Sequence, residues 1–319
     1  MPDAVLTQAL STVTLGEPQV WHGLTVFPLM APDERPPAYD TFGMAHSAGA
    51  FLVTEVSESG TVGQLRAENT GSRPVLLLDG EEVIGAKQNR IINLTILVPA
   101  HTTMTIPVTC VEQGRWSLQS KAFSESGRAM FADGRARKMR DVTRSMRERG
   151  GAAADQGAVW DSVAERLDMN RASSPTGAMS AMYEQGRAGI DGYVTALEPL
   201  PLQVGAVFGM NGRIVGAELF DSSASYAVSA PKIIRSYAVQ HSGDGAVPVP
   251  ETEASAFIAR LCSVEPTEHS PPGAGRQLRF EEGDTLGAAL VHEDRVVHLA
   301  AFRVEDAAPP PRRARELIR

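Results

Sequence analysis

The chain has 319 residues, of which 43% are hydrophobic and 21% are charged, so it can bury a sizeable core. Its formal net charge of −8 argues against nucleic acid as a partner. The two cysteines, Cys110 and Cys262, are too few for a disulfide framework or a cysteine-based zinc site and fit a reducing compartment, so we expect a cytoplasmic protein.

The first part of the chain, to about residue 120, predicts short strands. The segments "VWHGLTVFPL", "FLVTEV" and "RPVLLLDG" are rich in β-branched and apolar residues and are separated by turn residues. From Lys87 onward the hydrophobic pattern repeats every two residues, with Ile92, Leu94, Ile96 and Val98 on one face and Asn89, Ile91, Asn93 and Thr95 on the other. We therefore expect an antiparallel sandwich or a barrel-like sheet here.

Two segments could be mistaken for membrane or export signals. The uncharged stretch 91–111 is long enough to cross a membrane, but its asparagine, five threonines and two prolines predict two strands and a turn. The N-terminal segment lacks a basic region followed by a long apolar stretch, so we expect no secretory signal. We predict no membrane partner.

A basic insertion follows at 128–150. Residues 128–149 include eight basic and three acidic side chains, and a helix would place Arg137, Arg140, Arg144 and Arg147 along one face until the glycines at 150–151 end it. Such a segment could contact phosphates, but charge runs are usually solvated, so we expect a solvated, mobile segment. Its role is left open.

The rest of the chain alternates predicted helices and hairpins. Asp155 is a candidate cap for a helix with Val159, Trp160, Val163 and Leu167 on one face, and a weaker helix follows within 174–189. The turns at Asn211-Gly212 and Glu293-Asp294 predict two hairpins. Between them, helices are expected in "SAPKIIRSYAVQ", beginning near Pro231, and in "PETEASAFIARLC".

These elements together predict an α+β fold. It has a β-rich N-terminal third, a helical middle, and C-terminal hairpins with helices. We expect one compact domain over residues 1–305 and a flexible, proline- and arginine-rich tail over 306–319.

The string "DGEEVIGAKQNRIIN" lies between two apolar runs and is the first candidate site. Adjacent strand residues face opposite sides, so only one of Glu81 and Glu82 should face any given site. A carboxylate held near Lys87 or Arg90 could act as a general base or orient a hydroxyl. Two asparagines on one face, Asn89 and Asn93, are about 13 Å apart along an extended strand and could bind a polar ligand. The alternative is a hairpin turn with solvated charges.

The string "CVEQGRW" is the second candidate. Cys110 shares the parity of apolar neighbours, which predicts a buried, inert thiol, although a nucleophilic cysteine is a further option. Glu112 lies at the strand end, Arg115 could bind a phosphate or carboxylate, and Trp116 could stack on a ring. The alternative is an edge ion pair beside a core tryptophan.

The segment "PKIIRSYA" is the third candidate. In a helix beginning near Pro231, Lys232, Arg235 and Ser236 share a face close to the N-terminus, where an anion would be favoured. The alternative is a solvated face. No Walker loop, GxSxG or strand-linked GxGxxG is present, and the seven histidines have no metal-ligand spacing, so no metal or cofactor is expected.

The strings "LLLDGEEVIGAKQNRIIN", "IPVTCVEQGRW", "GAELFDS" and "KIIRSYA" resemble a domain family named for its association with ADP-ribosylglycohydrolases and rhodanese-phosphatases. The resemblance covers roughly residues 10–305. It implies an α+β fold and a place in ADP-ribose or NAD-derived metabolism, and it supplies no mechanism. A polar string shared by a family favours a site over a turn.

We therefore predict an enzyme or sensor for an ADP-ribose or NAD-derived ligand. The predicted catalytic pair is Glu82, as acid/base group, with Glu112. The predicted ligand-binding residues are Glu81, Lys87, Gln88, Asn89, Arg90, Asn93, Arg115, Trp116, Lys232 and Arg235. Arg90, Arg115 and Arg235 would meet phosphates, and the two asparagines sugar hydroxyls. A non-catalytic binding or adaptor module is the alternative, a cysteine-dependent hydrolase is a third option, and catalysis and oligomeric state are left open.

Overall fold

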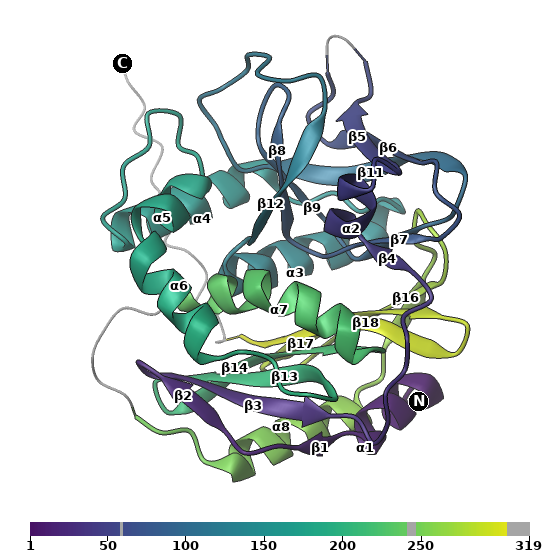
Figure 1. The fold of residues 1–319 in the computed structure, drawn as a ribbon, viewed down its shortest axis with the longest axis vertical. Coiled ribbons are helices and arrows are strands. Elements are labelled where there is room, and N and C mark those ends of the chain that lie inside the picture. Colours follow the sequence, from purple (N-terminus) through teal and green to yellow (C-terminus); the bar gives the residue numbers. More distant parts are fainter. Residues whose placement is uncertain (58–59, 241–246, 305–319) are drawn as a thin grey trace.

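The structure is a computed structural model that describes residues 1–57, 60–240 and 247–304 (Figure 1). Helices and strands alternate along it, with a β-rich first third, a helical middle and a C-terminal part of strands and helices, so the predicted α+β fold is confirmed. The predicted flexible tail, 306–319, lies outside the described residues.

A closed six-stranded barrel occupies the β-rich third, in agreement with the predicted barrel-like sheet. Its neighbours run in the order β11-β6-β5-β12-β8-β9, and β11 pairs with β9 to close it. The strands are β5 (Phe51–Glu55), β6 (Gln64–Asn69), β8 (Glu81–Gly85), β9 (Arg90–Ile92), β11 (Thr102–Cys110) and β12 (Phe123–Ala129). In β5 and β6 buried and exposed positions alternate, so one face of each strand is turned into the apolar interior.

The predicted single strand across 87–98 is instead two strands in different sheets. Strand β9 ends at Ile92, and β10 (Ile96–Val98) pairs with β7 (Val75–Leu77), which pairs with β4 (Asp40–Thr41). Lys138 donates to the carbonyls of Ile92 and Asn93 at 3.1 and 2.9 Å, so the backbone leaves the barrel ladder at this point. The stretch 91–111 therefore contains parts of three strands rather than two.

A nine-stranded antiparallel sheet forms the other half of the described structure. Its order is β1-β3-β13-β14-β18-β17-β16-β15, with β2 also paired to β3. The strands are β1 (Thr14–Leu15), β2 (Gln19–Trp21), β3 (Leu24–Met30), β13 (Gln203–Met210), β14 (Arg213–Phe220), β15 (Thr267–His269), β16 (Arg276–Glu282), β17 (Thr285–His292) and β18 (Arg295–Arg303). The barrel is thus inserted between β3 and β13, which are neighbours in this sheet.

Both predicted hairpins are confirmed. Asn211 and Gly212, at φ 52° and 78°, join β13 to β14, and Glu293 and Asp294, at φ 48° and 56°, join β17 to β18. Two consecutive residues with positive φ are the signature of the tight turn whose twist matches antiparallel strands.

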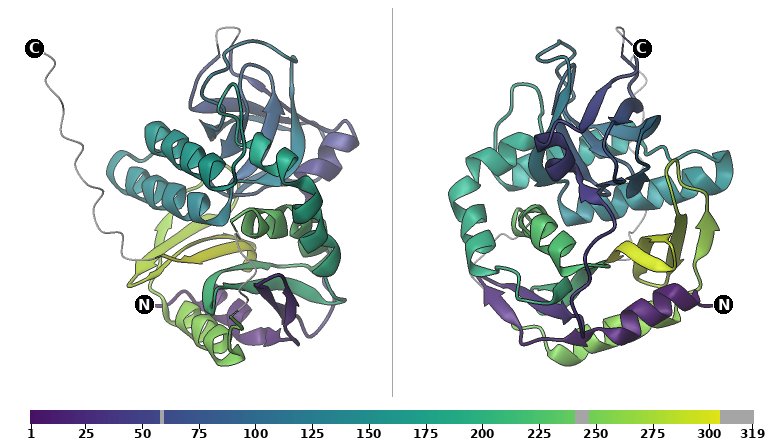
Figure 2. Two further views of the ribbon diagram at one scale, coloured as in Figure 1. Left: turned by 90° about the vertical axis from the view of Figure 1, so that its left-hand side faces the viewer. Right: turned by 45° about the vertical axis from the view of Figure 1, so that its right-hand side comes forward.

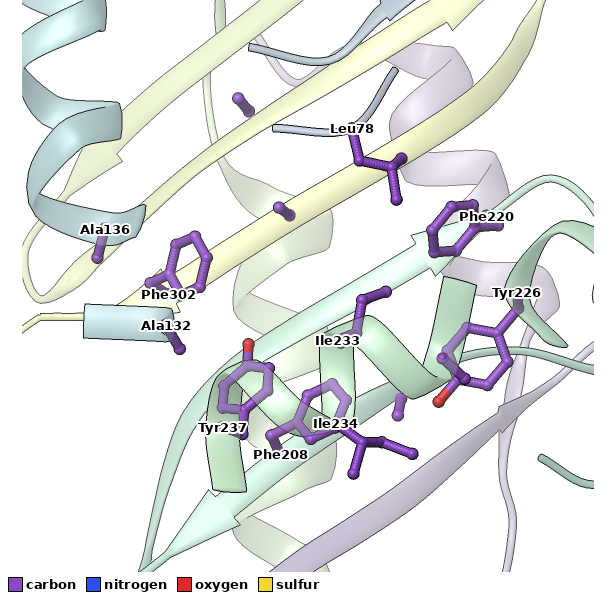
Figure 3. Close-up of a cluster of buried hydrophobic side chains, with 14 of the residues drawn as sticks. Leu78, Ala132, Ala136, Phe208, Phe220, Tyr226, Ile233, Ile234, Tyr237 and Phe302 are labelled. Carbon is purple, nitrogen blue, oxygen red and sulfur yellow. The ribbon is translucent and has the colours of Figure 1, made fainter. Parts of the chain in front are cut away.

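Helices cover both faces of the large sheet. On one face α3 (Ala132–Arg149) and α7 (Ser223–Ala238) pack against it, and the ring of Tyr237 stacks on Phe208 at 4.0 Å (Figure 3). On the other face α1 (Ala4–Thr12) and α8 (Glu251–Ser263) lie side by side (Figure 2). Helix α1 was not predicted, because its segment was interpreted as part of the strand-rich region.

The predicted start of α7 at Pro231 is wrong. The helix begins at Ser223, after the cap Ser222, and Pro231 lies inside it. The buried residues Tyr226, Ala230, Ile233 and Tyr237 follow helical spacing along one side, so the apolar stripe begins before the proline. Packing of this stripe on the sheet outweighs the lost backbone hydrogen bond at Pro231.

The remaining helices are α2 (Phe42–Ser47), α4 (Gln156–Met169), α5 (Ser180–Gln185) and α6 (Arg187–Ala196). The predicted cap of α4 is confirmed, since Asp155 accepts a hydrogen bond from the Ala158 N–H at 3.1 Å. Among the described residues no helix is long and apolar enough to cross a membrane. The single domain over 1–305 stays a prediction.

The basic segment 128–149 is largely helix α3, and Gly150, at φ 68°, ends it as predicted. The expectation of a solvated, mobile segment is wrong for two of its cations, because Arg135 and Lys138 are each 1% exposed. They face inward on the side of the helix opposite the exposed Arg137 and Arg147. The segment therefore joins the barrel to the large sheet.

Candidate functional site

Strand β8 turns its two glutamates to opposite sides, as the strand parity predicted. Glu81 and Glu82 are both buried, at 1% and 0% exposure, so the interpretation as a turn with solvated charges is wrong for them. Each carboxylate meets a different cation, and neither of these cations is Lys87 or Arg90.

Glu81 contacts Lys232 of α7, which also contacts Glu125 of β12. Burial raises the pKa of Glu81 even though Lys232 opposes it. Burial would lower the pKa of Lys232, but the two carboxylates raise it, so the ammonium stays charged. Lys232 lies in the middle of α7, and the predicted anion site at a helix N-terminus is therefore wrong.

Arg235, one turn further along α7, does not join the Glu81 cluster. It donates to Asp191 of α6 at 3.2 and 3.3 Å and to the carbonyl of Gly127 at 3.3 Å. Ligand binding by Lys232 and Arg235 stays a prediction.

Glu82 pairs with Arg128, which follows a bulge in β12. The Arg128 Nε donates to Glu82 Oε2 at 2.8 Å, and its Nη1 donates to Glu184 of α5 at 3.3 Å. Burial raises the pKa of Glu82, while the charge of Arg128 opposes the shift. Within the described residues Glu82 Oε1 is buried and has no hydrogen-bond partner. This oxygen is chemically available for a proton transfer or a further hydrogen bond.

Asn89, Glu112 and Arg115 form a second cluster, the motif clamp. Arg115 Nε donates to Glu112 Oε2 at 2.8 Å, and its Nη2 donates to Asn89 Oδ1 at 2.9 Å. Arg115 also donates to three backbone carbonyls, those of Gly85, Ala86 and Ser117. Its donors are thus engaged within the chain, and the clamp fixes the loop between β8 and β9.

The carboxylate of Glu112 is stabilised in its charged form. Burial would raise its pKa, but hydrogen bonds from Arg115, from the Thr176 hydroxyl at 2.8 Å and from the Asn89 N–H at 3.2 Å lower it. Asn93, by contrast, accepts from the Thr109 hydroxyl at 2.6 Å and donates to the Ala152 carbonyl.

A third cluster, the barrel mouth, consists of Glu55, Gln88, Arg90, Cys110 and Trp116 at one end of the barrel. Arg90 is fully buried, and its Nη1 donates to Gln88 Oε1 at 2.7 Å and to Cys110 Sγ at 2.5 Å. Glu55 Oε1 is 3.7 Å from Arg90 Nη2. Within the described residues, both oxygens of Glu55 and the Nε and Nη2 of Arg90 are buried without a hydrogen-bond partner.

Trp116 lies over the barrel mouth and is 48% exposed. Its ring centroid is 5.4 Å from the guanidinium carbon of Arg90 and 5.6 Å from the ammonium of Lys87. Beneath it, Cys110 is buried, as predicted, and burial raises the pKa of its thiol to about 11. Its lack of reactivity stays a prediction.

The structure brings some of the predicted residues together and separates others. Asn89, Glu112 and Arg115 are in direct contact, and Arg90 belongs to the neighbouring barrel mouth, whereas Glu82 is bound to Arg128. The roles predicted from the sequence require these five residues to share one cleft, and this stays a prediction.

Two features escaped the sequence reasoning. Glu55 continues the buried parity of Phe51 and Val53, a signal that could have found it. The second feature is a cluster of five buried ionisable residues, Asp79, Arg135, Lys138, Glu218 and His298, which we call the α3 seam. No local pattern in the sequence indicated it. There Arg135 Nη1 donates to Glu218 Oε1 at 2.5 Å, Lys138 donates to Asp79 at 2.9 Å, and His298 Nε2 lies 2.9 Å from Glu218 Oε2. Within the described residues no group of His, Cys, Asp or Glu is arranged to hold a metal ion.

Comparison with protein families shows the family of the chain. The model of the ARG and Rhodanese-Phosphatase-superfamily-associated Protein domain, ARPP-1, matches residues 12–302. The chain belongs to the ARPP-1 family. The match confirms the family that the polar strings resemble, and it spans both the barrel and the large sheet. The ARPP-1 name states an association and gives no ligand or reaction. No curated protein and no solved structure matches the chain.

Proposed function

We propose that the barrel mouth binds an ADP-ribose or NAD-derived ligand, and that the chain acts on this ligand or senses it. The observation that carries the proposal is the buried Arg90–Glu55 pair beneath a half-exposed tryptophan. Four hydrogen-bonding atoms of this pair have no partner among the described residues. A buried polar atom without a partner costs about 1–3 kcal/mol. A ligand that supplies the missing partners would recover this cost.

The residue types at the mouth match the parts of such a ligand. The planar guanidinium of Arg90 can bind a phosphate through two parallel hydrogen bonds, and the ammonium of Lys87 adds positive charge nearby. The carboxylate of Glu55 can accept hydrogen bonds from ribose hydroxyls. The exposed face of Trp116 can stack on adenine. Barrel mouths are frequent ligand sites in proteins.

A catalytic role is supported by Glu82. Its buried carboxyl group has a raised pKa and one oxygen without a partner, and it lies beside the cation of Arg128. A buried carboxyl group with a raised pKa is a typical acid/base candidate. In the enzyme version of the proposal, Glu82 is the acid/base group and Glu112 is its partner, as expected from the sequence.

The adaptor alternative has an observation of its own. Val62 and Leu118 are exposed on loops near Trp116, which gives the mouth an apolar rim suited to a partner protein. The cysteine-hydrolase option has less support, because Cys110 is buried and burial raises the pKa of its thiol.

Calorimetric titration of the full chain with ADP-ribose, NAD, AMP and ribose 5-phosphate tests the proposal. We expect binding of ADP-ribose or NAD, and Trp116→Ala should weaken it at least about fivefold, because a stacked ring contributes about 1–3 kcal/mol. The matched control is Trp21→Ala, since Trp21 is 40% exposed on β2 of the large sheet and should leave affinity unchanged.

Three results would count against the proposal. These are no heat of binding with any of the four compounds, an equal loss of affinity in the two tryptophan variants, or unchanged affinity in Trp116→Ala. A wild-type chain that binds none of them but captures a protein through the apolar rim would favour the adaptor.

A further inference from the structure

A second recess lies away from the barrel mouth, between the first half of α3, α4, the β13–β14 hairpin and the end of β18. It has a volume of about 620 Å³. This lies within the range of roughly 300–1,000 Å³ that is typical of small-molecule sites. We call it the arginine cavity, because its charged lining residues are Arg137, Arg140, Arg166, Arg213, Arg303 and Asp133.

The lining carries a surplus of positive charge. Among the described residues, five guanidinium groups line the cavity together with one carboxylate, Asp133, which Arg166 and Arg137 contact at 2.6 and 3.8 Å. Other carboxylates that pair with these arginines lie outside the lining, and one of them, Glu165, contacts Arg137 at 3.0 Å. Arg140 pairs with Glu281 at 2.7 Å and Arg303 with Asp284 at 2.6 Å, on partly exposed side chains. Such pairs contribute little to stability and use only some of the five donors of each arginine.

Two further observations point to an anion. Helix α3 begins at the cavity, with Ala132 and Asp133 in the lining. Its cap residue Phe131 provides no side-chain hydrogen bond, and the side chain of Gln240 accepts from the Asp133 N–H. The positive end of the helix dipole therefore adds to the arginine charges. In addition, Arg166 Nε is buried and lacks a hydrogen-bond partner within the described residues.

The rest of the lining is apolar. Met210, Val215 and Phe302 come from three strands of the large sheet and form one side of the cavity. A ligand that fits has several negative charges at one end and a flat or apolar group at the other. A bounded recess of this size suits a small molecule better than a nucleic-acid chain.

We propose that the arginine cavity binds a small molecule that carries two or more linked phosphates, such as a nucleoside diphosphate or a free polyphosphate. The phosphates contact Arg137, Arg140 and Arg166, and an attached base lies against Met210 and Phe302. This site goes beyond the proposed function, because it shares no residue with the barrel mouth.

Titration of the full chain with tripolyphosphate, pyrophosphate, orthophosphate and ADP tests the site. We expect affinity to rise with the number of linked phosphates and to fall as salt increases from about 50 to 200 mM. The double variant Arg137→Gln with Arg140→Gln should weaken tripolyphosphate binding at least tenfold. The matched control is Arg144→Gln with Arg147→Gln, which removes two exposed charges from the same helix outside the cavity and should weaken binding less than threefold.

The outcomes separate the alternatives. Tighter binding of ADP than of pyrophosphate supports a nucleotide, and the reverse supports free polyphosphate. Equal losses in both double variants, or no tripolyphosphate binding by the wild type, would overturn the proposal. So would an oligonucleotide that binds through the same two arginines more tightly than tripolyphosphate. If the cavity double variant unfolds at a lower temperature than the wild type, the single variant Arg137→Gln replaces it, because the Arg137 side chain is 56% exposed.

The same variants separate this proposal from the function of the barrel mouth. ADP-ribose binding that is lost in Trp116→Ala and kept in the cavity double variant leaves both proposals standing. ADP-ribose binding that is lost only in the cavity variant would end the barrel-mouth proposal and leave the arginine cavity intact.

Discussion

The barrel mouth and the α3 seam both bury arginine beside glutamate, but they differ in how the glutamate is bonded. At the seam, Glu218 accepts from Arg135 at 2.5 Å and lies 2.9 Å from His298 Nε2. At the mouth, Glu55 accepts no hydrogen bond from any described residue, and Arg90 donates only to an amide and a thiol. Asp79 Oδ1 and Arg135 Nε of the seam also lack hydrogen-bond partners among the described residues. Burial of a charge is costly unless it is paired. This contrast favours a structural role for the seam and is in line with the proposed ligand site at the mouth.

The largest expected effect is on turnover and concerns Glu82. One oxygen of its carboxylate is hydrogen-bonded, as at the seam, and the other has no partner among the described residues, as at the mouth. Glu82→Gln keeps the shape of the side chain but cannot take up a proton. If Glu82 is the acid/base group, turnover of an ADP-ribose-like substrate should fall about 10²- to 10⁴-fold. Affinity should change less than about tenfold. Product formation and calorimetry in one buffer measure both.

Glu184→Gln is the control for Glu82, since Glu184 contacts the same arginine but is 53% exposed. Turnover that persists in Glu82→Gln would end the acid/base assignment. An absence of turnover in the wild type over a broad substrate panel would favour a sensor or adaptor.

The next effect is on stability at the seam. Arg135→Met leaves Glu218 and Asp79 buried without this cation and should lower the free energy of unfolding by about 3–5 kcal/mol. Urea denaturation measures it. Arg137→Met on the exposed side of the same helix should change it by less than about 0.5 kcal/mol. A loss below about 1 kcal/mol in Arg135→Met would contradict the structural role of the seam.

A pH-dependent effect is expected at the motif clamp. The pKa of Glu112 is lowered in the folded chain, since the hydrogen bonds from Arg115, Thr176 and Asn89 outweigh burial. A lowered carboxyl pKa contributes stability above the unfolded pKa of about 4.3, and this stability is lost as the pH falls through the folded pKa. Glu112→Gln should therefore cost about 1.5–3 kcal/mol at pH 7.

The cost of Glu112→Gln should shrink as the pH drops below about 4. Denaturant titrations of wild type and variant from pH 7 to pH 3 measure this difference. A gap that stays constant across this range would show that the charge of Glu112 is not what stabilises the clamp.

The smallest expected effect on stability is at the barrel mouth, and it can be compared directly with the effect at the seam. The double variant Glu55→Leu with Arg90→Met replaces a poorly bonded ion pair with apolar groups. Unfolding free energy should stay within about 1 kcal/mol of wild type or rise, while ADP-ribose binding is lost. The matched seam variant, Arg135→Met with Glu218→Leu, should cost more than about 3 kcal/mol, because His298 and Asp79 each lose one of their buried partners. Similar costs in the two double variants would remove the distinction between the regions.

Local signals in the sequence predicted much of the fold. The Asn211-Gly212 and Glu293-Asp294 turns, the Asp155 cap and the Gly150 stop each depend on residues within a few positions, so a short window contains the cause. The end of strand β9 at Ile92 and the start of helix α7 before Pro231 depend on packing against residues that are distant in the sequence. A short window of sequence does not contain those residues. The prediction of a solvated segment was wrong for part of α3, because the general rule that charge runs are solvated does not consider buried partners.

The candidate site was predictable only in part, for the same reason. Strand parity placed Glu81 and Glu82 on opposite sides and Cys110 in the interior. The partner of Glu81, Lys232, is 151 residues away in the sequence, and the fold alone sets that contact. The arginines of the arginine cavity come from four separate elements, so no motif could have indicated it.

The insertion of the barrel between β3 and β13 has a consequence for the newly made chain. Met30 pairs with Gln203, across more than half of the sequence, whereas the barrel strands pair within residues 51–129. During synthesis the barrel can close first, while β3, whose residues are almost all buried in the finished sheet, lacks its β13 neighbour and can pair only with the short strands β1 and β2. A strand with an open apolar edge invites aggregation. Ribosome-bound chains that end before residue 203 are therefore the forms most in need of a chaperone.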